Sequence, residues 1–369
     1  MKLAILGTRG IPARYGGFET FAERLAVGLV EMGHEVTVYC AGSASAAPEE
    51  YRGVQLRYCP APRLGPLETI LYDIFCLWDA RRSFDVVYML GYGAAPACKI
   101  PRLWGTTIWI NPDGLEWARA KWNALAKAYF RMMEWASVRM ADRVIADAQA
   151  IAASLAERHG QRHSCSVIPY GCEIVDAPPP ASLLAEWELS AGDYYLVVCR
   201  LEPENHVLEI LRAFQQSRSA RKMVVVGNHR APGSYARQLR AIQDPRIRMI
   251  GTVYDPERLT ALRSHAFAYM HGHSVGGTNP SLLEAMGCGN AVFAHRNPFN
   301  QETLGGTGIF FDGVNDLAGA IDEAERDEHL LHARRAATKL RARTYYQWCD
   351  VVASYASLLE QKADVRQPA

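Results

Sequence analysis

The stretch HGHSVGGTNPSLLEAMGCGNAVFA, residues 271–294, reads in turn as the end of a strand, a polar loop with two glycines, a helix and a second strand. Gly276 and Gly277 permit backbone geometries with positive φ, which suits a loop that turns closely around a ligand. The simpler interpretation is a tight loop before an amphipathic helix, with Leu282 and Met286 in the core. The rest of the chain favours the ligand-binding interpretation.

The helix that follows this loop predicts a phosphate site. Thr278 and Asn279 offer capping side chains just ahead of Pro280, a residue that suits the first turn of a helix. The helix is therefore expected to begin at about Ser281, and its free amide groups and positive dipole end attract anions. Glu284, one turn further on, is placed to accept a hydrogen bond from a neutral hydroxyl such as that of a ribose.

Short apolar runs alternate with helical patterns along the chain and predict parallel sheets covered by helices. A first series of runs occupies residues 3–6, 36–40, 86–90, 107–110, 144–146 and 167–168. A second series occupies residues 195–199, 223–226, 247–250, 266–270, 291–294 and 309–311. At about 150 residues per domain, the 369 residues suggest two domains, each an α/β, doubly wound, Rossmann-like fold.

The domain boundary is expected near three consecutive prolines. Residues 171–182 contain Pro178, Pro179 and Pro180 and are predicted to be the interdomain linker. The N-terminal domain then covers residues 1–170 and the second domain residues 171–345. A helical pattern over about 330–362 predicts one long final helix, and the segment 346–369 is expected to return to the first domain. Because open α/β sheets bind ligands at the carboxyl ends of their strands, a site is expected in an interdomain cleft.

Charge and cysteine content exclude several classes of protein. Lys plus Arg number 40 against 39 Asp plus Glu, so the overall charge gives no indication of nucleic-acid binding, and none is expected. The nine cysteines include no Cys-x-x-Cys pair, which argues against a zinc site or a disulfide framework and favours a reducing cytoplasm. No run approaches 18 apolar residues and no signal peptide is recognised, so any membrane contact is expected to be peripheral.

The first turn of the chain, GTRGIPARYGGFET over residues 7–20, resembles a glycine-rich phosphate loop only in part. It is not the dinucleotide fingerprint, because Arg9 occupies the position of the second glycine. Gly16 and Gly17 form a second flexible turn ahead of a helix, and Arg9 and Arg14 flank it. This turn suits the approach to an anion, although a loop with solvated arginines is the alternative.

Several longer motifs carry a family resemblance over nearly the whole chain. They are IPYGCE (168–173), CRLEPEN (199–205), VVVGN (224–228), IGTVYD (250–255) and SLLEAMGCGNAVFA (281–294). Their order and spacing resemble those of the retaining family-four glycosyltransferases of GT-B fold. The turn at 7–20, NPDGLEWARAKW (111–122) and HGHSVGGTNPSLLEAMG (271–287) are most similar to the bacterial rhamnosyltransferase-like branch of surface polysaccharide assembly.

The resemblance implies roles for particular residues. It implies that Arg200 contacts the donor diphosphate and that Glu284 binds the ribose, and with Asp113 these form the expected catalytic set. The expected donor-binding residues are Gly16, Gly17, Arg9, Arg14, Asn205, His273, Gly277, Thr278, Asn279, Pro280, Ser281 and Leu282. No metal and no other cofactor is expected, since GT-B enzymes do not need a metal to bind the donor.

Two positions depart from the family pattern. Asn205 stands where relatives have a phosphate-binding lysine, and charge stabilisation by one such group is typically worth about 3 to 4 kcal/mol. Arg9, Arg14 and His206 are candidates to replace it. Gly276 stands where relatives have a glutamate that holds donor sugar hydroxyls, so their donor preference does not transfer to this chain.

Asp113 follows the strand ending at Ile110 and is expected at the edge of the cleft, where an acceptor hydroxyl arrives, with Glu116 close behind. A helix cap or Asx turn is the alternative, and neither carboxylate has a partner visible in the sequence. His271 and His273 share one face of a strand, but no nearby acid or cysteine completes a metal site. We expect them to be polar residues near the sugar.

The segment 117–143 suits the surface of a membrane. Its six basic residues are Arg119, Lys121, Lys127, Arg131, Arg139 and Arg143, its two acids are Glu134 and Asp142, and its interleaved aromatic residues are Trp117, Trp122, Tyr129, Phe130 and Trp135. Basic and aromatic side chains on helices favour peripheral binding to the inner membrane. Packing of the aromatic residues in a soluble core is the alternative.

The sequence therefore predicts a retaining hexosyltransferase that moves a sugar, with rhamnose as one candidate, from a nucleotide diphosphate donor to a saccharide. The acceptor is expected to be lipid-linked and to serve exopolysaccharide, capsule or O-antigen assembly. A nucleotide-sugar epimerase or hydrolase of similar architecture is one alternative, and free nucleotide and an altered sugar appearing without acceptor would favour it. A non-catalytic nucleotide-sugar-binding protein is the other, and donor binding without turnover would favour it.

Overall fold

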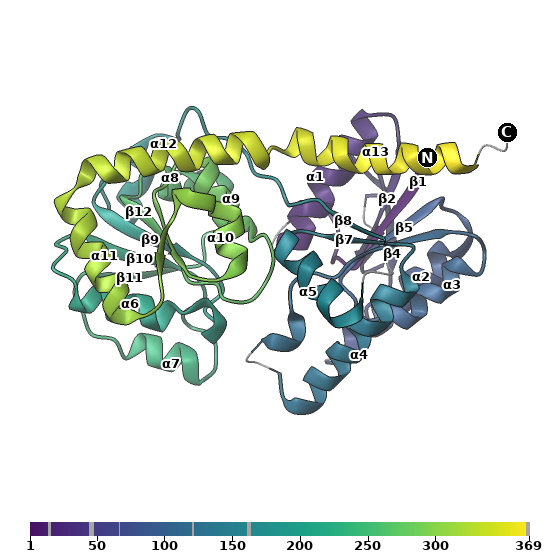
Figure 1. The fold of residues 1–369 in the computed structure, drawn as a ribbon, viewed down its shortest axis with the longest axis horizontal. Coiled ribbons are helices and arrows are strands. Elements are labelled where there is room, and N and C mark those ends of the chain that lie inside the picture. Colours follow the sequence, from purple (N-terminus) through teal and green to yellow (C-terminus); the bar gives the residue numbers. More distant parts are fainter. Residues whose placement is uncertain (14–15, 44–47, 66, 120–121, 161–163, 367–369) are drawn as a thin grey trace. The chain divides into compact units, whose positions relative to one another are not determined.

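The computed structural model describes residues 1–13, 16–43, 48–65, 67–119, 122–160 and 164–366. The chain forms two compact units, unit 1 with Met1–Tyr170 and Trp348–Ala369, and unit 2 with Gly171–Gln347. The boundary after residue 170 is the one at which the sequence pattern divides the chain. Figure 1 shows the helices and strands of both units.

Unit 1 is built on an eight-stranded sheet of order β3-β4-β2-β1-β5-β6-β7-β8, parallel except for the β3–β4 pair. Its strands are β1 (Lys2–Leu6), β2 (Glu35–Ala41), β3 (Glu50–Tyr51), β4 (Val54–Cys59), β5 (Val86–Leu90), β6 (Thr107–Asn111), β7 (Arg143–Ala146) and β8 (Cys165–Val167). Its α-helices are α1 (Gly17–Glu31), α2 (Leu67–Asp79), α3 (Lys99–Arg102), α4 (Ala124–Met140), α5 (Gln149–His159) and α13 (Trp348–Arg366). Short 3₁₀ helices are η2 (Ala80–Arg82), η3 (Ala95–Cys98) and η4 (Glu116–Ala118).

Unit 2 is built on a six-stranded, fully parallel sheet of order β11-β10-β9-β12-β13-β14. Its strands are β9 (Tyr194–Val198), β10 (Lys222–Val226), β11 (Ile247–Gly251), β12 (Ala268–His271), β13 (Val292–His295) and β14 (Ile309–Phe311). Its α-helices are α6 (Val207–Gln216), α7 (Ser234–Arg240), α8 (Pro256–Ser264), α9 (Pro280–Gly287), α10 (Pro298–Leu304), α11 (Val314–Arg326) and α12 (Glu328–Tyr345). Short 3₁₀ helices are η5 (Ala181–Trp187), η6 (Pro203–Asn205) and η7 (Gly305–Thr307).

All twelve strands predicted from apolar runs are present, because parallel strands covered on both faces are continuously apolar. Every residue of β5 is buried, for example. The runs did not reveal β3 and β4. In β4 buried and exposed residues alternate through most of the strand, and β3 has only two residues, so neither gives a continuous apolar signal.

The segment 171–182 is not a free linker, because its backbone is bound to unit 2. The amide of Cys172 donates to the carbonyl of Tyr346 (2.7 Å), and the carbonyl of Pro179 accepts from His265 Nε2 (2.7 Å). The predicted continuous helix over 330–362 is also wrong. It is interrupted at Tyr346 and Gln347, where Tyr346 is buried in unit 2 and Gln347 forms a β-bridge with Cys172.

The last helix belongs to unit 1. In Figure 1, α13 lies along α1, and the rings of Tyr355 and Phe21 are 5.8 Å apart. The hydroxyl groups of Tyr355 and Tyr88 share a hydrogen bond of 2.7 Å inside the core. None of the helices in the described part of the chain has the length and apolar character needed to span a membrane.

In both sheets the strand order reverses beside the first strand of the unit, at β1–β5 and at β9–β12. Ligands of open α/β sheets bind outside the carboxyl ends of strands at such switch points. The loops after β1, β9 and β12 are therefore where each unit should carry its site.

Candidate functional site

The loop after β12 ends in a capped helix, as predicted. Asn279 Oδ1 accepts a hydrogen bond from the amide of Ser281 (3.0 Å), and Pro280 opens α9. Gly276 takes φ = +136°, whereas Gly277 does not use the left-handed region. Thr278, the other expected cap, is buried. The amides of Ser281, Leu282 and Leu283 all donate to Asn279, so the first turn of α9 offers the β9–β12 switch point its positive dipole end.

Hydrogen bonds fix this first turn against two strands. Ser281 Oγ donates to the carbonyl of Val198 at the end of β9 (2.9 Å) and lies 2.7 Å from the hydroxyl of Tyr269 in β12. Tyr269 also donates to Val198 (3.1 Å). The side chain of Leu282 is fully buried, so only its backbone is available to a ligand. The anion-attracting end of α9 is thus held rigidly close to the loop that carries Arg200.

Glu284 has a partner that the sequence did not reveal. Arg263 of α8 lies 2.5 Å from Glu284 Oε2 and 3.5 Å from Ser281 Oγ. The Arg263 side chain is only 5% exposed, whereas that of Glu284 is 42% exposed. Arg263 therefore holds one carboxylate oxygen from below, and the carboxylate still faces solvent. No sequence motif links the two residues, which lie on different helices.

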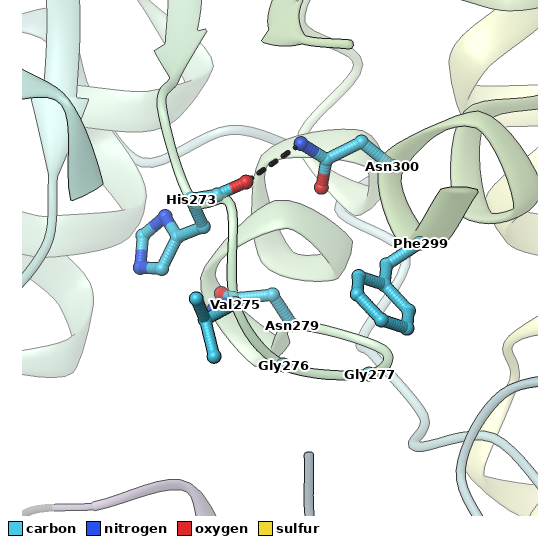
Figure 2. A pocket seen from close by; sticks show the side chains of 7 residues that line it. All are labelled: His273, Val275, Gly276, Gly277, Asn279, Phe299 and Asn300. Carbon is cyan, nitrogen blue, oxygen red and sulfur yellow. Dashed lines mark hydrogen bonds between the residues drawn. The ribbon is translucent and has the colours of Figure 1, made fainter. Parts of the chain in front are cut away.

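A small pocket lies beside the loop (Figure 2). Its lining includes three predicted site residues, His273, Gly277 and Asn279. The other four lining residues are Val275, Gly276, Phe299 and Asn300. The amide of Asn300 donates to the backbone carbonyl of His273 (2.9 Å). Phe299 and Asn300 come from α10, about a strand and a turn further along the chain, and no local pattern in the sequence marked them.

The turn after β9 positions Arg200 and buries Asn205. Arg200 is half exposed, with its guanidinium 3.9 Å from Glu202. Asn205 is 4% exposed, and its amide donates to the carbonyl of Arg200 (2.6 Å). Asn205 therefore closes the turn that presents Arg200, and its contact with the donor stays a prediction.

Four histidines gather near this edge of the unit 2 sheet. The rings of His271 and His273 stack with centroids 4.4 Å apart, and those of His206 and His295 do the same. Burial, and then repulsion by His273 and His295, lowers the pKa of His271 well below its usual range. Within the described residues, no group of three or more His, Cys, Asp or Glu side chains is arranged to hold a metal ion.

The loop after β1 in unit 1 carries the other predicted anion-binding residues. Gly16 caps α1 with φ = +118°. Arg9 does not present a free charge, because its guanidinium pairs with Glu68 (3.0 Å) and donates to Thr69 (3.3 Å). Glu19 accepts from the amide of Arg9 (3.0 Å), and a Cβ atom on Gly16 would collide with its carboxylate. Glu19 thus occupies the space over the loop.

Two residues named in the sequence predictions, Arg14 and Lys121, lie outside the described residues. In the segment 117–143, only Trp135 of the five aromatic residues is exposed. Trp117 and Trp122 each donate an indole N–H to a glutamate at 2.9 Å. Most of the aromatic residues therefore pack within unit 1.

Asp113 lies just after β6 in a strained turn. Its φ is +56°, and its amide donates to Asn111 Oδ1 (2.8 Å), so Asn111 forms the Asx turn. Arg119 lies 3.8 Å from Asp113 and 2.6 Å from Glu116. The two carboxylates thus share a cationic partner that the sequence had not indicated.

The two units match different protein families. Residues 188–343 match the family described as glycosyl transferases group 1. This part of the chain is therefore similar to a group 1 glycosyltransferase domain. It contains Arg200, the pocket residues and all of α9. Residues 1–173 match a domain of unknown function, DUF1972. No protein with a curated description matches the chain in sequence.

Several solved structures share the fold over nearly the whole chain. Sucrose-phosphate synthase from Thermosynechococcus elongatus has a TM-score of 0.83 at 18% identity, covering 99% of each chain. Anabaena HepE, solved in complex with UDP-glucose, has a TM-score of 0.76 at 16% identity, covering 98% of this chain and 100% of HepE. A glycosyltransferase from Rickettsia africae has a TM-score of 0.75 at 15% identity and covers 98% of each chain. The predicted GT-B fold with two Rossmann-like domains is confirmed.

Proposed function

We propose that this protein is a glycosyltransferase that transfers a sugar with retention of anomeric configuration from a nucleoside diphosphate to a saccharide, with rhamnose as one candidate. The observation that carries the proposal is the capped start of α9 at the β9–β12 switch point, with Glu284 in the same helix and Arg200 in the turn after β9. Binding of UDP-glucose by HepE, which has the same fold, supports a nucleotide sugar as the donor.

Different residues of unit 2 bind different parts of the donor. The positive dipole end of α9 and the guanidinium of Arg200 stabilise the diphosphate, and the solvent-facing carboxylate of Glu284 accepts from the ribose. Charge builds up on the diphosphate as the sugar leaves, and fixed donors aimed at that charge stabilise the transition state most. Neither role needs a metal.

Retention follows if the departing diphosphate acts as the base. The acceptor oxygen then bonds to the anomeric carbon on the face from which the phosphate oxygen leaves, and the acceptor proton passes to that phosphate oxygen. Asp113 orients the acceptor in this scheme, and its pairing with Arg119 favours orientation over proton removal. Asp113→Asn should therefore retain measurable transfer, whereas Arg200→Ala should remove most of it.

The acceptor is proposed to be lipid-linked, with unit 1 at the surface of an anionic membrane. Exposed tryptophans on three elements support this proposal, namely Trp135, Trp78 and Trp104. An arginine lies over each of these rings: Arg139 over Trp135 (4.1 Å), Arg81 over Trp78 (4.4 Å) and Arg82 over Trp104 (5.1 Å). Each basic residue near an anionic leaflet contributes about 1 kcal/mol. The protein should sediment with anionic vesicles and be released by salt; equal binding to neutral vesicles, or none to either, contradicts this.

Two measurements test the reaction. A thermal-shift panel of nucleotide sugars identifies the donor, because a ligand at 100 times its dissociation constant stabilises by about 2.7 kcal/mol. Proton NMR of the first product with that donor then reports the anomeric configuration. A product with inverted configuration, or loss of transfer in Asp113→Asn with acceptor binding intact, would overturn the mechanism. The absence of any nucleotide-sugar binding would overturn the function itself.

A further inference from the structure

Glu204 carries a buried carboxylate that forms no hydrogen bond with the described part of the chain. It lies in η6, directly after β9, and is 7% exposed. Among the described residues, neither of its carboxylate oxygens has a hydrogen-bond partner. Burying a carboxylate without a partner is strongly unfavourable, so a chain that keeps one without structural need points to a ligand.

The backbone of Glu204 is bound to the loop that lines the pocket of Figure 2. Its backbone carbonyl accepts two hydrogen bonds from Ser274, one from the amide and one from the hydroxyl, both of 3.0 Å. Ser274 stands between His273 and Val275, and both line the pocket. Gly272 packs so closely on this turn that a Cβ there would collide with the carbonyl of Asn205. Glu204 is therefore held rigidly beside the pocket-lining loop.

The charges nearby determine what Glu204 can bind. Arg200 and the start of α9 attract the anionic part of a ligand, and a carboxylate repels it. Glu204 therefore suits the neutral part, and a carboxylate accepts hydrogen bonds from hydroxyl groups. We propose that Glu204 binds hydroxyl groups of the donor sugar and selects which sugar is accepted. This inference rests on the proposed function.

Calorimetric titration of the wild type and Glu204→Gln tests the inference. The probes are UDP-glucose, dTDP-rhamnose and GDP-mannose, each compared with its own nucleoside diphosphate. The wild type should bind its preferred nucleotide sugar more tightly than the diphosphate alone. In Glu204→Gln this sugar-dependent gain should fall by about tenfold or more, with diphosphate affinity within about twofold of the wild type.

The control is Glu257→Gln, an exposed glutamate of α8, which should leave both affinities unchanged. Because the Glu204 carboxylate has no hydrogen-bond partner among the described residues, Glu204→Gln should unfold at the same temperature as the wild type or higher. If the variant is unstable, deoxygenated donors titrated into the wild type replace it, and loss of one hydroxyl should cost about tenfold.

An unchanged sugar-dependent gain in Glu204→Gln overturns this inference and leaves the proposed function standing. A wild type that binds neither diphosphate nor nucleotide sugar overturns both. Stabilisation of the wild type, but not of Glu204→Gln, by MgCl₂ alone would make Glu204 a cation ligand and also overturn the inference.

Discussion

At the scale of single residues, side chains from distant parts of the chain decide what the candidate site can do. Glu284 is placed by Arg263, and the charge of Arg9 is paired with Glu68 instead of facing a ligand. His271 keeps both ring nitrogens without a partner among the described residues. Such pairings form only when the helices pack together, so they cannot be inferred from the neighbouring residues in the sequence. Arg263 and His271 each lead to a prediction.

Arg263 is expected to act on the nucleotide through Glu284. Arg263→Gln frees the Glu284 carboxylate to move, so nucleoside diphosphate affinity should fall by about tenfold, as expected for Glu284→Ala. The double variant should be no worse than either single variant, because the two residues act as one unit. Arg258→Gln, an exposed arginine of the same helix, is the control. Additive losses measured by calorimetry would show that Arg263 has a separate role.

His271 should make stability depend on pH. Its pKa is lowered in the folded state, so below about pH 6.5 the unfolded chain binds a proton that the folded chain does not. Stability should therefore fall with decreasing pH, by at most about 1.4 kcal/mol per pH unit for this group. His271→Phe should reduce the dependence of the free energy of unfolding on pH between pH 7.5 and 5.5. His329→Phe, at an exposed position, should not. If the free energy of unfolding depends on pH equally in the wild type and in His271→Phe, His271 is not the source of the pH dependence.

At the scale of elements, the start of α9 combines a structural cap with a proposed binding function. The same asparagine that ends the glycine loop accepts from the amide of Ser281, and Ser281 is bound to β9. Sequence reasoning located this element well, because capping depends on residues next to each other in the chain. It missed β3 and β4, and it joined α12 and α13 into one helix.

Asn279 variants separate the two functions of α9. Asn279→Ala should destabilise unit 2 by about 1 kcal/mol through loss of the cap. Asn279→Asp keeps a capping oxygen and should keep stability, but its negative charge should weaken diphosphate binding by about tenfold or more. Asp327→Ala removes the cap of α12 and serves as a stability control without an effect on binding. Full diphosphate affinity in Asn279→Asp would exclude the start of α9 as the phosphate site.

At the scale of the whole molecule, the chain forms two units, each with its own sheet, and its last helix belongs to unit 1. That helix fits against a glycine of α1. A Cβ atom on Gly28 would lie 2.7 Å from the side chain of Val352, closer than such atoms approach in proteins. The stability of unit 1 therefore depends on a contact between residues more than three hundred positions apart.

Gly28→Ala should destabilise unit 1 by about 1 to 3 kcal/mol, because Val352 is stiff and cannot move aside easily. Val352→Ala in the same chain should restore much of the loss by making room. Gly319→Ala in α11 is the matched control, since nothing lies within 4 Å of its Cβ; it should stabilise by up to about 1 kcal/mol. If chemical denaturation shows no difference between the two alanine variants, α13 does not pack tightly on α1.

The sequence by itself determined the twelve main strands, the division near residue 170 and the start of α9. These features depend on apolar runs, turns and caps, whose physical causes lie within a few residues of one another. The tertiary structure decided the pairing of Glu284 with Arg263, the burial of Asn205, the engagement of Arg9 and the isolation of the Glu204 carboxylate. Those outcomes depend on which helices and loops pack together at the ends of the strands, and no local pattern in the chain records that packing.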